Sequence, residues 1–86
     1  MKGKKTKERT ISGIVVPEDW DDNDNVTRVA IKTPDYQEYV VEHNTVGRQL
    51  LSLINRKLRA RGAIRERSGG DMIISVKSFE RIEEEE

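Results

Sequence analysis

The sequence predicts an all-β domain with one short helix, folded as a five-stranded barrel in the order strand, strand, strand, helix, strand, strand. Two observations predict this class. Three strand-like segments precede one short helical pattern, and two more strand-like segments follow it. Only 34% of the 86 residues are apolar, which suits a barrel because each strand needs only a few inward side chains. The length allows one domain.

The first predicted strand spans residues 10–17, where β-branched residues end at a proline. Gly13 in its middle predicts a bulge or a tight bend. An acidic loop at residues 18–25 follows and contains the single tryptophan, Trp20. Its alternating Asp and Asn residues resemble the start of an EF-hand loop, but the glycine and glutamate that such a loop requires are absent. We expect a solvated acidic turn and no metal site.

The second and third predicted strands, at residues 26–33 and 38–43, form a hairpin. Residues 26–33 alternate in character, and the pattern places Arg28 and Lys32 on the same face. Proline and aspartate in the short connection favour a tight turn.

A short amphipathic helix is predicted next. Asn44 or Thr45 is a suitable N-cap, and apolar residues then recur every three to four positions over about two to three turns. We expect Leu50, Leu51 and Ile54 to plug one end of the barrel.

The last two strands form the second predicted hairpin. In the fourth strand every second residue faces inward; these residues are Leu58, Ala60, Gly62 and Ile64. The Ser-Gly-Gly-Asp sequence at residues 68–71 indicates a tight turn. The fifth strand occupies residues 72–76 and continues towards Phe79.

The block from Gly47 to Val76 resembles the second half of small OB-fold domains of the tRNA-anticodon-binding type. In those domains a plugging helix leads into a strand of the form V-x-x-x-G-x-V, followed by a glycine turn and I-x-V. Gly62, the Gly69-Gly70 pair and the Ile74/Val76 pair match that form. The resemblance covers roughly residues 10–80 and implies an OB-fold barrel. It does not imply one function, because fold alone does not determine function.

Charge is balanced in total but uneven along the chain. Lys and Arg number 16, as do Asp and Glu. Residues 1–9 are basic and residues 83–86 are acidic, and we expect both to be disordered tails around an OB-fold domain at residues 10–82. No apolar run approaches the length of a membrane span, and no apolar stretch follows the basic start. We therefore expect a cytoplasmic protein without membrane association.

Two classes of function follow from these features. The first is a module that binds single-stranded DNA or RNA through a basic strand and the barrel face. The tentative site residues are Arg28, Lys32, Tyr39, Arg59, Arg61, Arg65 and Trp20. Two alternatives stay open here: the outward arginines pair with nearby acids, and Tyr39 belongs to the core. The acidic loop also opposes a polyanion.

The second class is a protein-interaction module, which includes self-association. Here Trp20 and the acidic loop around it dock onto a complementary partner. The alternative for Trp20 is that it folds back and caps the barrel rim. Catalysis lacks support, because the chain has no cysteine, one histidine (His43) and no phosphate-binding loop or serine-nucleophile motif. We expect a non-enzyme without a cofactor.

Overall fold

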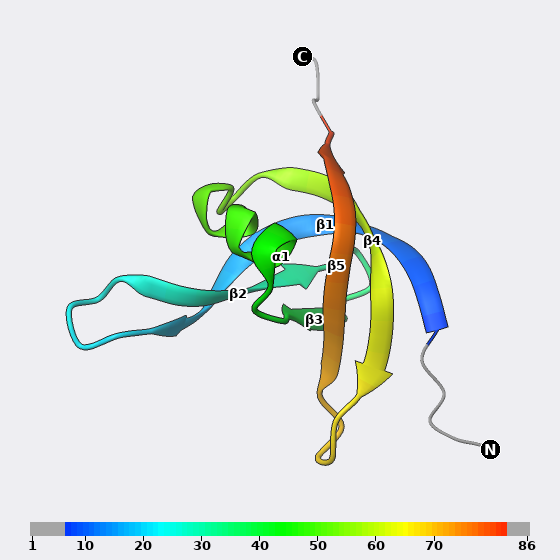
Figure 1. Cartoon of the computed structure of the whole chain (residues 1–86), viewed down its shortest axis with the longest axis horizontal. Helices are drawn as coiled ribbons and strands as arrows, with labels where there is room; N and C mark the ends of the chain where they lie inside the picture. Colours follow the sequence, from blue (N-terminus) through cyan, green and yellow to red (C-terminus); the bar gives the residue numbers. More distant parts are fainter. Residues whose placement is uncertain (1–6, 83–86) are drawn as a thin grey trace.

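The computed structural model describes residues 7–82, and these form a closed five-stranded sheet with one short helix (Figure 1). The elements are β1 (Lys7–Trp20), β2 (Val26–Lys32), β3 (Glu38–Val41), α1 (Thr45–Gln49), a 3-10 turn η1 (Leu50–Ser52), β4 (Lys57–Glu66) and β5 (Met72–Arg81). Their order along the chain is the predicted one.

The order in space differs from the order along the chain, because β5 lies between β3 and β4. The spatial order is β1-β2-β3-β5-β4, and pairing of β4 with β1 closes the sheet. β3 and β5 are parallel, with Val40 opposite Ile73, whereas the other four pairings are antiparallel. The helical connection between β3 and β4 permits this arrangement, since consecutive strands separated by a long connection need not be neighbours.

β1 is the longest strand and pairs with two partners in turn. Its first half pairs with β4 and its second half with β2, and Ile14 pairs with both strands. Gly13 lies at this transition, where a Cβ atom would stand 2.3 Å from the carbonyl oxygen of Lys32. Only glycine fits so close an approach of two backbones.

The boundaries of β1 correct two expectations. The strand begins at Lys7, so residues 7–9, expected in a disordered tail, are paired with β4. The remaining basic tail, residues 1–6, and the acidic tail, residues 83–86, lie outside the described residues. β1 also continues past Pro17 to Trp20, so the acidic segment forms most of a protruding hairpin with β2 (Figure 1). Two register shifts between Pro17 and Trp20 make this part of β1 irregular.

The core fills the interior of the closed sheet with aliphatic side chains. Leu58, Ala60, Gly62 and Ile64 are all buried, which confirms the predicted inward face of β4. Gly62 also permits close contact, because a Cβ atom there would stand 2.1 Å from the carbonyl oxygen of Ser75. Among the described residues, no charged or polar residue is buried.

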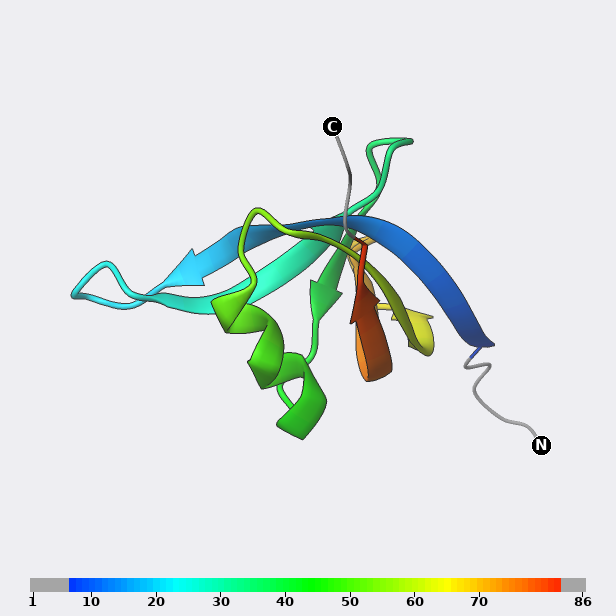
Figure 2. The ribbon, with the colours of Figure 1, turned by 90° about the horizontal axis from the view of Figure 1, so that it is seen from above.

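The helix closes one end of the barrel, and the β2–β3 turn lies away from it (Figure 2). Asn44 is the N-cap, and its side-chain oxygen accepts a hydrogen bond from the Gly47 N–H at 2.6 Å. Leu50 is fully buried, and Leu51 and Ile54 pack against the core cluster. The predicted plug is therefore confirmed, although α1 is only five residues long and continues as a 3-10 turn. None of the helical segments within residues 7–82 has the length and apolar character needed to span a membrane.

We expect Leu50→Ala to lower the free energy of unfolding by about 2–5 kcal/mol, because the truncation leaves a cavity at the end of the barrel. Urea denaturation followed by circular dichroism measures this change. Gln49→Ala is the matched control, since Gln49 is exposed and surface changes usually stay within about 0.5 kcal/mol. A loss as small as that of the control would show that Leu50 does not support the fold.

Candidate anion-binding site

The outward face of β4 does not offer a row of unpaired cations. Arg59 forms an ion pair with Glu80 of β5, and Arg61 pairs with Glu8 of β1 at 3.1 Å. Lys77 pairs with the same Glu8 carboxylate. For Arg59 and Arg61 these contacts agree with the alternative interpretation of the sequence, in which the outward arginines pair with nearby acids. Exposed ion pairs are weak, so these residues contribute little to the stability of the fold. Their carboxylates still reduce the positive potential along the outward face of β4.

Tyr39 is not available for base stacking. It lies opposite Ile31 in the β2–β3 ladder, and directly opposite residues project to the same side of a sheet. Ile31 is fully buried, and Tyr39 is only 8% exposed and belongs to the core cluster. The expectation of a stacking surface at Tyr39 is therefore wrong, and the alternative that it is a core residue is correct.

Two of the predicted site residues do meet at one place on the barrel. Arg28 of β2 and Arg65 of β4 line a depression of about 170 Å³. Arg67 and His43 complete its polar lining, and Glu42 is the single acid among the described residues that line it. The apolar part of the lining comes from β3 and β5. We call this depression the arginine pocket.

The three arginines of the arginine pocket differ in whether they have an ion-pair or hydrogen-bond partner. The Arg65 guanidinium lies 3.4 Å from Glu42, and that of Arg67 lies 2.9 Å from Asp71. Arg28 is half-buried, and its Nε–H is buried with no hydrogen-bond partner among the described residues. A buried donor without a partner costs about 1–3 kcal/mol.

His43 fixes the edge of the arginine pocket. Its Nε2–H donates to the carbonyl oxygen of Thr27 at 2.8 Å, which ties the segment after β3 to β2. A carbonyl only accepts, so the ring carries a proton on Nε2. Arg67 and His43 were not among the predicted site residues. Arg67 belongs to the same basic run as Arg65, but the position of His43 depends on the pairing of β3 with β2 and β5.

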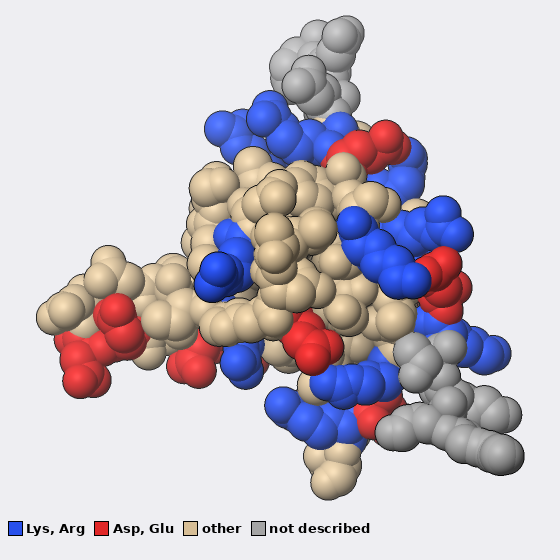
Figure 3. Space-filling view, viewed as in Figure 1, with Lys and Arg blue, Asp and Glu red and all other residues tan. Residues whose placement is uncertain are grey.

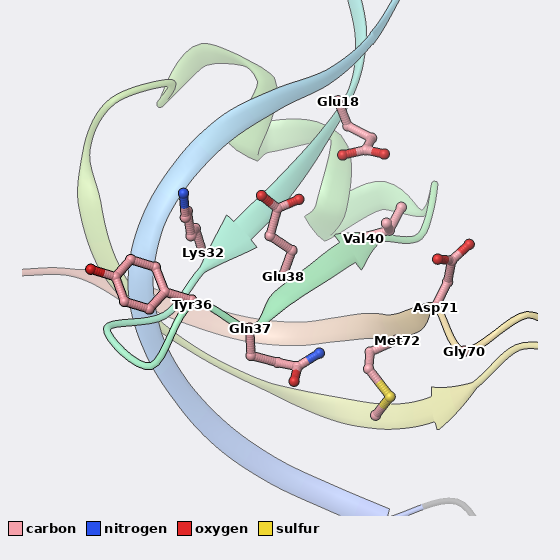
Figure 4. Close-up of a pocket in the computed structure, with 9 residues that line it drawn as sticks. All are labelled: Glu18, Lys32, Tyr36, Gln37, Glu38, Val40, Gly70, Asp71 and Met72. Atoms are coloured by element: carbon pink, nitrogen blue, oxygen red, sulfur yellow. The ribbon is translucent and has the colours of Figure 1, made fainter.

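A second depression beside the arginine pocket is acidic. It measures about 330 Å³, and Glu18, Glu38 and Asp71 surround it together with Lys32 (Figure 4). Burial, and then repulsion from Glu38, raise the pKa of Glu18. Val40 lines both depressions. The same barrel face is therefore cationic at one end and anionic at the other, which limits the length of polyanion that it can accept.

The remaining predicted site residues lie elsewhere. Lys32 is exposed, and its Nζ lies 5.7 Å from the ring centroid of Tyr36. Trp20 ends β1 and is 51% exposed, so it does not cap the barrel rim. In the acidic turn, one Asp21 carboxylate oxygen accepts hydrogen bonds from the backbone N–H groups of Asn23 and Asn25. These bonds lower the pKa of Asp21, the Asn25 bond most strongly. Its role in the turn is structural.

These observations define a small closed β-barrel with a cationic depression on one face. Comparisons with protein-family models, curated protein sequences and solved structures found no match.

Glu18→Gln should stabilise the protein at neutral pH by less than about 1 kcal/mol, as is typical of exposed charges. The raised pKa means that the folded state holds the Glu18 proton more tightly than the unfolded state. The free energy of unfolding of the wild type therefore falls as pH rises through and above the ordinary glutamate range. The Glu18→Gln variant does not lose this stability, because it has no carboxyl group at position 18. Urea denaturation at neutral pH and at about pH 3.5, below that range, measures the difference.

The advantage of Glu18→Gln should disappear at the lower pH, where both proteins are uncharged at this position. Glu66→Gln is the control, because Glu66 is exposed at the end of β4 and does not line the acidic depression. Equal effects of the two substitutions at both pH values would contradict the electrostatic cause.

Proposed function

We propose that this chain is a non-catalytic OB-fold module that binds single-stranded nucleic acid through phosphate contacts in the arginine pocket. Three features support the OB-fold assignment: the helix between β3 and β4, the parallel β3–β5 pair, and closure of β1 on β4. OB-fold barrels bind oligonucleotides on the face of strands 2 and 3, between the loops that follow strands 1 and 4. Arg28 and Arg67 belong to that region of this barrel.

The observation that carries the proposal is the convergence of Arg28, Arg65 and Arg67 on one depression. Guanidinium groups bind phosphate oxygens in a bidentate manner. A phosphate in the arginine pocket would pair with the guanidinium groups and compete with Glu42 for Arg65. Binding of this kind recognises the charge and position of the phosphates but does not distinguish base sequences.

The surroundings of the arginine pocket limit the length of nucleic acid that can bind there. No Phe, Tyr or Trp is among the described residues that line it, so the stacking energy of about 1–3 kcal/mol per base that such rings contribute in many complexes is missing. The acidic depression next to it repels the continuing strand. We infer a weak, salt-sensitive contact with one or two phosphates in the cytoplasm, the location expected from the sequence.

The salt dependence of binding tests the proposal. For single strands each phosphate contact contributes about −0.7 to the slope of log K against log salt, so one or two contacts give a slope of about −0.7 to −1.4. Fluorescence anisotropy of a labelled oligothymidylate of about 12 nucleotides, a usual site size, measures this slope between about 50 and 200 mM salt.

The double variant Arg28→Ala/Arg65→Ala should bind the oligonucleotide at least tenfold more weakly and bring the slope towards zero. The matched control is Arg59→Ala/Arg61→Ala, which removes the same charge from the ion-paired face of β4. Arg65→Gln is a milder variant that tests the pocket if the double variant does not fold. Equal losses in the pocket and control variants would contradict a specific site, and no binding by the wild type would contradict the function.

A second candidate function is protein interaction, and one observation favours it. Trp20 is half exposed at the end of β1, and the arginine pocket does not use it.

A further inference from the structure

Three large apolar side chains are exposed within residues 7–82, and phosphate binding uses none of them. Ile14 is 44% exposed, Trp20 51% and Tyr36 83%. Ile14 and Tyr36 line one groove of about 320 Å³, and Trp20 is not part of it. The exposed hydrophobic groups thus form two separate features, a groove and a projecting side chain.

The lining of the groove combines apolar side chains with two lysines. Ile14, Val16, Pro34 and Tyr36 provide the apolar part, and Lys32 and Lys57 also line the groove. None of the described residues that line it is acidic. We call it the lysine-rimmed groove. Its chemistry suits an apolar or aromatic side chain that is flanked by carboxylates.

The projecting feature has the opposite character. Residues 17–26, here called the acidic arm, contain Trp20 and five carboxylates and no basic residue. The arm extends away from the barrel, and acidic side chains appear on its visible surface (Figures 1 and 3). Trp20 lies opposite Val26 in the β1–β2 ladder. The arm therefore presents one exposed indole within a field of negative charge.

The acidic arm cannot fill the lysine-rimmed groove of its own chain. Ile14 and Trp20 belong to the same strand and are six residues apart, which corresponds to about 20 Å at about 3.3 Å per residue. Pairing with β2 holds that part of β1 extended. An arm that reaches a groove of this kind must come from another molecule.

We propose that the acidic arm of one copy docks into the lysine-rimmed groove of a second copy. Trp20 packs against Ile14 and Tyr36, and the carboxylates of the arm approach the two lysines. One chain carries both complementary features. The arm has an exposed tryptophan among carboxylates, and the groove has an apolar lining with two lysines. The contact is heterologous, since an arm meets a groove, so it occurs either twice in a closed dimer or repeatedly along a chain of molecules.

The association is expected to be weak, because one aromatic side chain and a few exposed ion pairs carry it. Sedimentation velocity should show a reversible increase in mean mass over about 10–500 µM, a range suited to a small transient interface. The emission of Trp20, the single tryptophan, should shift to shorter wavelength over the same range. High salt should weaken the association.

Two single variants and their mixture test the docking geometry. Trp20→Ala removes the arm contact and keeps the groove, whereas Tyr36→Ala removes the groove contact and keeps the arm. Each variant alone should associate at least tenfold more weakly than the wild type. An equimolar mixture should regain association, because an intact arm then meets an intact groove. Circular dichroism confirms that both variants are folded.

Three outcomes would overturn the proposal: a wild type that stays monomeric throughout, a Trp20→Ala variant that associates like the wild type, and a mixture that fails to regain association. The last result would mean that the arm and the groove are not partners. The Arg28→Ala/Arg65→Ala variant should self-associate normally. Its result therefore separates this proposal from nucleic-acid binding.

Discussion

The parallel pairing of β3 with β5 is the constraint on which the rest of the structure depends. It is only three residue pairs long, with Tyr39, Val40 and Val41 opposite Met72, Ile73 and Ile74. Without it the β1–β2–β3 and β4–β5 units would share only the β1–β4 ladder, and the sheet would remain open. The same pairing brings the ends of β4 and β5 beside β2, so that Arg65 and Arg67 reach Arg28.

Ion pairing differs from place to place on the surface of this chain, which has no net charge. Along β4 the arginines at positions 59 and 61 face acids on both neighbouring strands, Glu80 on β5 and Glu8 on β1. At the far end of β4, Arg65 and Arg67 also pair with acids, Glu42 and Asp71, whereas Arg28 has no ion pair among the described residues. Arg28 is therefore the arginine of the pocket without an ion-paired acid, and such local differences in potential matter more than total charge.

The sequence predicted the elements well and their neighbours poorly. The inward face of β4, the Asn44 cap and the Leu50 plug follow from periodicity and capping, which are local properties. The ion pairs of Arg59 and Arg61 depend on which strands lie beside β4, and no local pattern specifies that. Tyr39 was ambiguous because β3 is too short for alternation to distinguish the two faces of the sheet. The meeting of Arg28 with Arg65 required the closed topology, which places strands distant in sequence side by side.

Pro17 in the acidic arm has a consequence for whether another strand can pair with this edge of the sheet. The Val15 N–H points away from β2, to the carbonyl oxygen of Arg56 at 3.1 Å. Residues two apart in a strand direct their amides the same way, so the donor that Pro17 lacks would have faced outward. The register shifts between Pro17 and Trp20 disturb the same edge. A foreign strand therefore finds no regular ladder to extend, and the arm is restricted to contacts made by its side chains.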